Sequence, residues 1–309
     1  MSSQVEKKPR SARAYVPGHV TGIFRIHDSH ENPLHCGSTG AGFCFAAGTT
    51  TTVKLEENPF LEISVEYNDS KIDAPVTVTV IRRLLEGKDS EYRINVKHES
   101  SLPIGVGFGA SGAGALGTAL ALSHLLGRSD DIQSTASHAH YAEVVNRTGL
   151  GDVIAQTAGG MEIRIRPGAP GIGKVVNIPV PEDLQVVLAG APGLETRSVL
   201  SDKTHRERII KAADGLMSEL IQDPSVERFI SSSREFALAT NLMTPRVRSS
   251  LDDLESQGFN DASMVMIGDS VFCLSEPGAS QRAADILAER WDRSEILLSS
   301  ISDNGGRLV

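Results

Sequence analysis

Apolar and polar positions along the chain repeat with two different periods, and the changes between them predict the order of strands and helices. Alternation with a period of two and short apolar runs between turn residues favour strands. In the first half, strands are predicted near Arg13 (broken at Pro17-Gly18), Thr49–Leu55, Phe60–Tyr67, Tyr92–His98, Met161–Arg166 and Val175–Ile178. Val76–Leu85 fits a strand or a helix, and the Gly-, Ser-, Asn- and Pro-rich stretch 28–42 predicts an ordered loop.

Helical spacing predicts two helices over 109–126 and 131–147, and a helical turn after Gly149–Asp152. The stretch 100–127 has no Asp, Glu, Lys or Arg and is long enough to span a bilayer. Its first half is rich in glycine, and each glycine inside a helix costs about 1 kcal/mol relative to alanine. The helical part is therefore too short for a membrane span.

The second half predicts a strand at 184–189, helices at 198–222, 226–239 and 246–256, strands at 262–267 and 271–274, a helix at 279–289 and a strand at 294–298. Reduced to its sheet, this order is the β-α-β-β-α-β of ferredoxin-like domains. The fold class is thus α+β with two packed domains. We expect a loose tail over 1–12, an N-terminal mixed α/β domain over 13–180 and a C-terminal ferredoxin-like domain over 181–309.

Composition narrows the class of partner. Thirty Lys and Arg against 39 Asp and Glu give the 309-residue chain a formal net charge of −9. This balance argues against a nucleic-acid partner, whose phosphates need a basic face. Three scattered cysteines form no disulfide framework or four-ligand zinc site, and the polar N-terminus has no secretory signal. A cytoplasmic location is expected, with no membrane partner.

The glycine run Pro103–Gly114 is the most informative segment. Amides at a glycine-rich helix start point outward and can hold phosphate oxygens. The alternative to a phosphate-binding role is that these glycines only allow close packing of the helix. Gly107-x-Gly109-x-x-Gly112 also matches the dinucleotide fingerprint, but the acid expected at a second strand end falls at a helix start instead. The near-Walker run 168–175 lacks the Ser or Thr for Mg²⁺ and leads into a strand, so it is interpreted as a turn.

Three motifs resemble the GHMP superfamily of galactokinase, homoserine, mevalonate and phosphomevalonate kinases. They are Pro17-Gly18-His19 after a strand, the phosphate loop Pro103-IGVGFGASGA, and Glu143-VVNRTGLG-Asp152. The runs PGHVTGIFRIHDS, PLHCGSTGAG, HYAEVVNRTGLGDVIAQTAGGMEIR and ASMVMIGDSVF are similar to the archaeal pantoate kinase family. The resemblance implies the two-domain GHMP kinase fold.

The chain departs from the superfamily pattern at three places. His19 stands where Lys or Arg is usual, Ala110 replaces the first serine of the phosphate loop, and the C-terminal glycine motif is reduced to Ile267-Gly268-Asp269-Ser270. These differences weaken mevalonate or homoserine as substrates. They leave phosphoryl transfer intact.

The resemblance assigns the phosphate-binding and catalytic roles. The ATP phosphates would lie on Gly105, Gly107, Phe108, Gly109, Ala110, Ser111, Gly112 and Ala113. Ser111 and Glu143 would hold Mg²⁺, since hard cations prefer oxygen ligands. Asp152 would accept the proton of the substrate alcohol. The alternatives are an exposed helix acid for Glu143 and a helix N-cap for Asp152.

A short hydroxy acid needs a cation for its carboxylate, and Arg164 can pair with it bidentately. A solvated strand arginine is the alternative, with Arg166 and Arg82 unassigned. By resemblance, the substrate contacts are Ser38, His140, Arg164 and Thr196. His19 would support the same pocket or be a core or loop histidine.

These assignments imply an ATP- and Mg²⁺-dependent kinase that phosphorylates the 4-hydroxyl of (R)-pantoate to 4-phosphopantoate in archaeal coenzyme A biosynthesis. The family also suggests a homodimer. The alternatives are a kinase of the same fold for another small alcohol (mevalonate, homoserine or shikimate), a non-catalytic nucleotide-binding protein and, more distantly, an oxidoreductase.

Overall fold

The computed structural model describes residues 10–87, 92–128, 131–193 and 196–309. Positions 1–9 of the predicted tail 1–12 lie outside the described residues. The last three positions already belong to a strand, which begins at Arg10. Within the described ranges, none of the helices combines the length and the apolar character that crossing a membrane requires. The charge-free stretch 100–127 instead supplies a helix whose side chains are buried on nearly every side.

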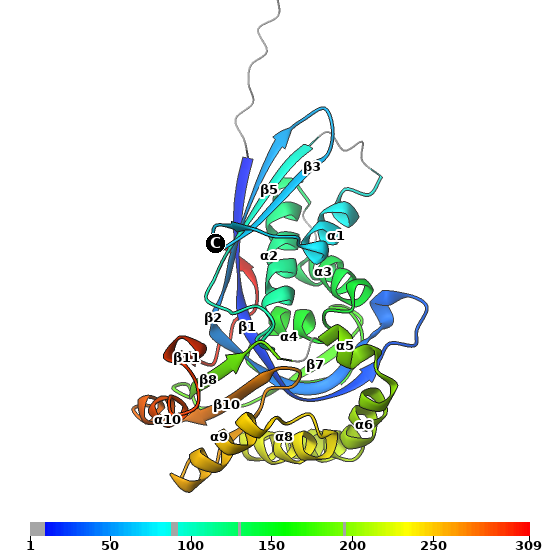
Figure 1. Cartoon of the computed structure of the whole chain (residues 1–309). Coiled ribbons are helices and arrows are strands. Elements are labelled where there is room, and N and C mark those ends of the chain that lie inside the picture. The colour runs from blue at the N-terminus through cyan, green and yellow to red at the C-terminus, as the bar shows by residue number, and fades with distance from the viewer. Residues whose placement is uncertain (1–9, 88–91, 129–130, 194–195) are drawn as a thin grey trace, which may run out of the picture.

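Eight strands of the described chain form the first sheet, in the order β12-β1-β2-β5-β3-β4, with β6 on β2 and β7 on β6 (Figure 1). Their bounds are β1 Arg10–His27, β2 Gly37–Glu57, β3 Glu62–Tyr67, β4 Ser70–Lys71, β5 Tyr92–Ser100, β6 Met161–Arg166, β7 Lys174–Ile178 and β12 Arg307–Leu308. The pairing of β3 with β5 is parallel and the other pairings are antiparallel. β2 changes partner along its length, from β6 to β5, and so links both ends of the sheet.

The helices of the first half lie on one face of this sheet, as Figure 1 shows. They are α1 Pro75–Leu84, α2 Ala110–Leu125, α3 Ile132–Asn146 and α4 Asp152–Ala158, with a 3-10 turn η1 at Pro33–His35. α2 packs directly on β1 and β2, and α1, α3 and α4 pack on α2. Small residues on α2 allow this close approach. At Gly117, for example, an added Cβ would lie 2.4 Å from Thr51 Oγ1 of β2.

The second sheet has the order β11-β8-β10-β9. Its strands are β8 Gln185–Ala191, β9 Ala262–Met264, β10 Asp269–Ser275 and β11 Ile296–Ser300; the helices of this half are α5 Thr196–Ser201, α6 Lys203–Ala213, α7 Leu216–Gln222, α8 Val226–Thr240, α9 Pro245–Ser256 and α10 Ser280–Leu287, with η2 at Arg293–Glu295. In chain order, the sheet is fourth-first-third-second, which is the ferredoxin-like arrangement. The predicted C-terminal fold is confirmed.

The predicted break of the first strand at Pro17-Gly18 is wrong. β1 continues through both residues, with a shift of register between them. The extra residues of this bulge are Ala46 and Ala47 of β2, so the ladder is interrupted directly beside Pro17, where the missing N–H of proline is tolerated. Gly18 leaves room for the ring of Phe45, whose Cζ would lie 2.2 Å from an added Cβ.

Two further predictions of the first half change. The loop expected over 28–42 ends at Cys36, because β2 already begins at Gly37. Glycines are tolerated in this strand since the neighbouring chain passes very close: a Cβ on Gly42 would lie 2.1 Å from the carbonyl oxygen of Val20. The ambiguous segment Val76–Leu85 is helical, and Pro75 occupies the first turn, where its missing N–H costs nothing.

In the second half, the helix predicted over 198–222 is three helices, α5, α6 and α7, separated near Asp202 and at Asp214-Gly215. The strand predicted over 262–267 ends at Met264. The strand β12 has no counterpart in the sequence prediction, and it returns the C-terminus to β1 of the first sheet. β7 ends at Ile178 and β8 begins at Gln185, and the domain boundary near 180 stays a prediction.

Candidate active site

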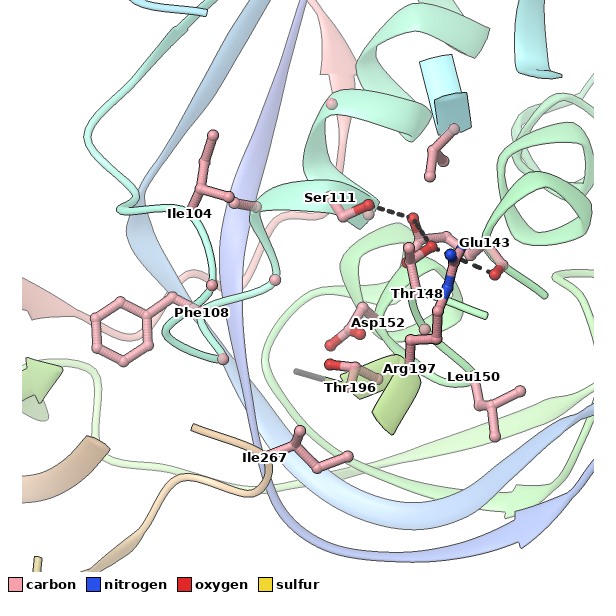
Figure 2. A pocket seen from close by; sticks show the side chains of 18 of the residues that line it. Ile104, Phe108, Ser111, Glu143, Thr148, Leu150, Asp152, Thr196, Arg197 and Ile267 are labelled. Atoms are coloured by element: carbon pink, nitrogen blue, oxygen red, sulfur yellow. Dashed lines mark hydrogen bonds between the residues drawn. The ribbon is translucent and has the colours of Figure 1, made fainter. Parts of the chain in front are cut away.

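A pocket of about 630 Å³ lies between the glycine run, the start of α4 and the second sheet. Its wall includes the loop Pro103–Gly112, Glu143 of α3, the turn Thr148–Asp152, the region around Thr196 and the turn after β9. Figure 2 shows Ser111, Glu143, Asp152, Thr196 and Ile267 around this space. Segments far apart in the sequence therefore meet at one cavity.

The glycine run forms a loop that ends in the N-terminus of α2. Gly105, Gly107 and Gly109 have φ values of +82°, +84° and +72°, which favour glycine, and Gly109 is the N-cap of the helix. At Gly107 an added Cβ would also lie 2.9 Å from the carbonyl oxygen of Ile267. The three glycines are thus required by the backbone conformation of the loop and not merely by the packing of α2. The loop also lies at a helix N-terminus, which is suited to bind an anion.

The predicted phosphate-binding residues lie along this loop, and all except Ala113 line the pocket. Ala113 is fully buried in the first turn of α2. The side chain of Phe108 is also buried, edge-on to Phe45. For these two residues a phosphate contact could involve only the backbone.

Ser111 and Glu143 are in direct contact. Ser111 Oγ donates to Glu143 Oε1 at 2.5 Å, and Thr148 Oγ1 donates to the same oxygen at 3.0 Å (Figure 2). Glu143 is 2% exposed, which differs from the exposed helix acid considered as an alternative. Burial raises the pKa of this carboxyl to about 7, against the opposing effect of the Ser111 bond.

The donor set around Glu143 fits a hard divalent cation. Glu143 Oε2 is buried and has no hydrogen-bond partner among the described residues. It faces Gly149, where an added Cβ would lie 2.3 Å from it and 3.1 Å from Asp152 Oδ2. A buried carboxylate oxygen, a hydroxyl and room for water are what Mg²⁺ uses in phosphoryl-transfer sites. Ser111 and Glu143 are therefore suited to hold it.

Asp152 is the first residue of α4, and Gly151 is the N-cap, so Asp152 does not have the capping role considered as an alternative. Its side chain is 27% exposed and lines the pocket. Asp152 Oδ1 accepts from His19 Nδ1 at 2.8 Å. Burial raises the pKa of Asp152, but the His19 bond and the nearby Arg164 outweigh it and leave the pKa below its usual range.

His19 and Arg164 lie behind the pocket wall. His19 is 0% exposed, and its Nε2 lies in hydrogen-bond contact with Glu162 Oε1 at 3.0 Å. Arg164 Nη1 donates to the same carboxylate oxygen. Neither residue belongs to the pocket lining in the described part of the chain. A direct substrate contact by either one stays a prediction, and it would need access past the wall.

The other predicted substrate residues divide into two groups. Ser38 and Thr196 line the pocket. His140 is 1% exposed, and its Nε2 donates to the carbonyl oxygen of Cys36 at 2.8 Å. Burial lowers the pKa of His140 to about 4, so it is neutral at physiological pH. The sequence predicts that His140 and Glu143 project from one face of a helix, and both side chains are buried.

Three residues of the site were not found from the sequence. Thr148 lies inside the Glu143–Asp152 motif, and its hydroxyl could have been suspected from that position. Gln156 Nε2 donates to the carbonyl oxygens of Pro17 and Gly109, and only the fold brings those atoms together. Among the described residues that line the pocket, Arg197 is the only Lys or Arg. It belongs to none of the sequence motifs, so no motif spacing could have identified it.

Comparison with known proteins places the chain among characterised families. The family model "GHMP kinases N terminal domain" matches residues 76–160. A pantoate kinase of Thermococcus kodakarensis is 36% identical over 291 residues, which are 92% of this chain and 95% of that protein. A pantoate kinase of Methanocaldococcus jannaschii is 33% identical over 88% of this chain and 96% of its own length.

Solved structures show the same architecture. A phosphotransferase related to the CoA biosynthesis pathway matches with a TM-score of 0.86 at 32% identity, over 97% of this chain and 99% of that one. A homoserine kinase from Cytophaga hutchinsonii matches with a TM-score of 0.71 at 18% identity, over 100% of this chain and 99% of its own. The second likeness concerns the fold alone.

Proposed function

The chain belongs to the pantoate kinase family of GHMP kinases, and from this premise we propose that it is an ATP-dependent kinase acting on (R)-pantoate. The reaction transfers the γ-phosphoryl group of ATP to the 4-hydroxyl, giving 4-phosphopantoate and ADP, in coenzyme A biosynthesis. One observation carries the mechanism: the phosphate loop, Glu143 and Asp152 meet at one pocket.

The phosphate loop would bind the ATP phosphates. Its glycines leave the backbone open to phosphate oxygens, and the α2 N-terminus adds a partial positive charge. Phosphoryl transfer depends on such positioning and charge neutralisation more than on covalent chemistry by the protein. Mg²⁺, held by Ser111 and Glu143, would neutralise charge on the phosphates when bound.

Asp152 would receive the proton that the 4-hydroxyl loses as its oxygen bonds to phosphorus. The bond to ADP breaks in the same transfer, and the proton passes from Asp152 to solvent afterwards. A carboxylate with a lowered pKa can play this part because the alcohol loses its proton late. Asp152 Oδ2 faces Gly149 beside Glu143 Oε2, so proton acceptor and metal ligand face the same point.

Ser38 and Thr196 would orient the hydroxyl and carboxylate groups of pantoate from the pocket wall. Arg164 is proposed to favour the anionic end. Its Nε is buried without a hydrogen-bond partner in the described chain, and Ser38 Oγ and this Nε flank Gly151. At Gly151 an added Cβ would lie 2.5 Å from Ser38 Oγ and 2.8 Å from Arg164 Nε. His140 is proposed to support this end through its bond to Cys36.

The test of this function is a substrate panel. Purified protein with ATP and Mg²⁺ receives pantoate, mevalonate, homoserine or shikimate, and ADP release and the phosphorylated product are measured. We expect ADP release and 4-phosphopantoate with pantoate only. ADP release no higher than background with pantoate would refute the substrate assignment, and ATP binding without any turnover would indicate a non-catalytic protein.

A substitution tests Asp152. In Asp152→Asn the amide cannot accept the proton, so we expect kcat to fall by roughly 10²- to 10⁴-fold while ATP binding by calorimetry is kept. The control is Asp253→Asn. Asp253 forms an ion pair with Arg290 at the surface, so this variant should keep wild-type turnover. Wild-type kcat in Asp152→Asn would remove this residue from its proposed role.

The family resemblance also supports a homodimer in the cytoplasm. Light scattering coupled to size-exclusion chromatography tests the oligomeric state: a mass near 66 kDa, twice that of the 33.0 kDa chain, is expected, and a single-chain mass would contradict it.

A further inference from the structure

Four ionisable side chains lie in an unbroken row that begins at Asp152 and runs behind the pocket wall. Asp152 bonds to His19 at 2.8 Å, His19 bonds to Glu162 at 3.0 Å, and Glu162 pairs with Arg164. The last three side chains are at most 1% exposed. Only Asp152, at the end of the row, reaches the pocket.

The geometry around His19 favours a positively charged ring. Each ring nitrogen faces a carboxylate oxygen, and an ionised carboxylate can only accept hydrogen bonds. A neutral imidazole has one N–H and could satisfy only one of the two. Both bonds are made together when both nitrogens carry hydrogen, that is, when His19 is an imidazolium.

This charge also balances the row. With both carboxylates ionised and with His19 and Arg164 positive, the four groups together are neutral. Without the imidazolium, two carboxylates would share a buried site with one cation, an arrangement that proteins avoid.

We propose that His19 is a positioning residue for the transfer step: as an imidazolium it keeps Asp152 ionised and turns its second oxygen towards the pocket, while Glu162, which is itself paired with Arg164, holds the imidazolium in place. This inference rests on the proposed function, because it gives Asp152 its proton-accepting role. It assigns His19 a place behind the catalytic acid and not in the substrate pocket.

The surrounding groups support the proposal. Burial lowers the pKa of His19, but the bonds to Asp152 and Glu162 outweigh it and raise the pKa above its usual value. Among the described residues, the other titratable groups near the row are Cys44 of β2 and Glu143 of α3 beyond Asp152; Cys44 is a buried thiol whose pKa is raised well above its usual value by burial. The His19 backbone N–H also donates to the carbonyl oxygen of Phe108 at 3.1 Å, which ties the row to the phosphate loop.

The kinetic test uses His19→Asn and His19→Gln. The asparagine amide can still donate towards Asp152 and the glutamine amide towards Glu162, but both variants lack the positive charge. A nearby opposite charge lowers a carboxyl pKa by about 1 to 3 units, so its loss should move the acid limb of the kcat–pH profile at least about one unit higher. We expect kcat near pH 7 to fall at least about tenfold, with little change in KM for ATP and pantoate.

His124→Asn, an exposed histidine near the end of α2, is the matched control and should keep the wild-type profile. An unmoved acid limb together with a raised KM for pantoate would show that His19 contacts substrate, and it would overturn the proposal. An unchanged kcat and acid limb would overturn it as well. Glu162→Gln should move the acid limb in the same direction by a smaller amount.

A second measurement does not depend on the variants folding or on turnover. Nitrogen-15 NMR of the wild-type protein without ligands reports whether both ring nitrogens of His19 are protonated at pH 7. Two protonated nitrogens are expected, and a neutral ring would overturn the proposal. If wild-type protein with an imidazolium at His19 fails to phosphorylate pantoate, the proposed function fails while the charge assignment stands.

Discussion

Glu143 shows how one buried side chain can be prepared for a metal ion. Its first oxygen accepts from Ser111 and Thr148, while its second has no partner among the described residues. A buried acceptor without a partner is costly, so proteins keep such groups mainly where a ligand supplies the missing contact. The lack of a side chain at Gly149 leaves space beside this oxygen.

Gly149→Ala tests that space. An added Cβ would lie 2.3 Å from Glu143 Oε2, so the carboxylate must move away from its present position. We expect a higher Mg²⁺ concentration for half-maximal rate and a loss of about 1 to 3 kcal/mol of stability from overpacking. Mg²⁺ titrations of the initial rate and urea unfolding measure the two effects.

Gly258→Ala provides the control for this substitution. Its backbone has a φ of +87° and nothing lies within 4 Å of an added Cβ, so it tests backbone strain at a residue outside the pocket lining. It should lose about 1 kcal/mol of stability and keep the wild-type Mg²⁺ dependence. An identical Mg²⁺ dependence in Gly149→Ala would contradict the role given to this space.

At the scale of elements, the short helix α4 joins the acid to the phosphate loop. Asp152 and Gln156 are four residues apart and therefore lie on one face of α4. Asp152 faces the pocket, and Gln156 donates to the carbonyl oxygens of Pro17 and Gly109. One turn of helix thus sets the distance between the proposed proton acceptor and the proposed phosphate loop.

Gln156→Leu tests this link. Leucine removes both donations and leaves the Pro17 and Gly109 carbonyls without this partner, at a cost of about 1 to 3 kcal/mol. We expect a several-fold higher KM for ATP, because the loop would no longer be held at Gly109. ATP titration of the rate is the measurement, and Gln281→Leu on the exposed face of α10 is the control. An unaltered KM for ATP would show that α4 does not hold the loop.

At the scale of the whole molecule, the fold buries two neutral histidines, His98 and His140. Burial lowers the pKa of His98 and of His140 to about 4. In the unfolded chain both would take up protons near pH 6.5. The stability that each contributes is therefore fully present above pH 6.5 and is lost as the pH falls towards 4, by about 3 kcal/mol per histidine.

His140→Gln tests this dependence, because the amide can still donate to the Cys36 carbonyl but does not titrate. Urea unfolding between pH 7.5 and 4.5 should show a smaller loss of stability than in wild type. Glu143, with its pKa raised to about 7, acts in the opposite direction, so the difference between variant and wild type is the informative quantity. His35→Gln, which is exposed, should keep the wild-type slope. Equal slopes in His140→Gln and wild type would contradict a neutral buried His140.

The sequence by itself determined the features that depend on neighbouring residues. Helix and strand periods predicted the ferredoxin-like order of the C-terminal half, and the glycine run predicted a loop that opens α2. These succeed because a repeat of apolar positions or a glycine with positive φ acts over a few residues. The resemblance of short motifs then indicated the GHMP kinase family.

Only the tertiary structure decided what depends on residues that are distant in the chain. β1 continues through Pro17 because β2 pairs with it on both sides of a bulge, and β12 joins the first sheet by pairing with that strand. His19 looked like a pocket residue, yet it lies between carboxylates from α4 and β6. Burial and ion pairing set the charge of such a group, and both come from segments that no local pattern relates.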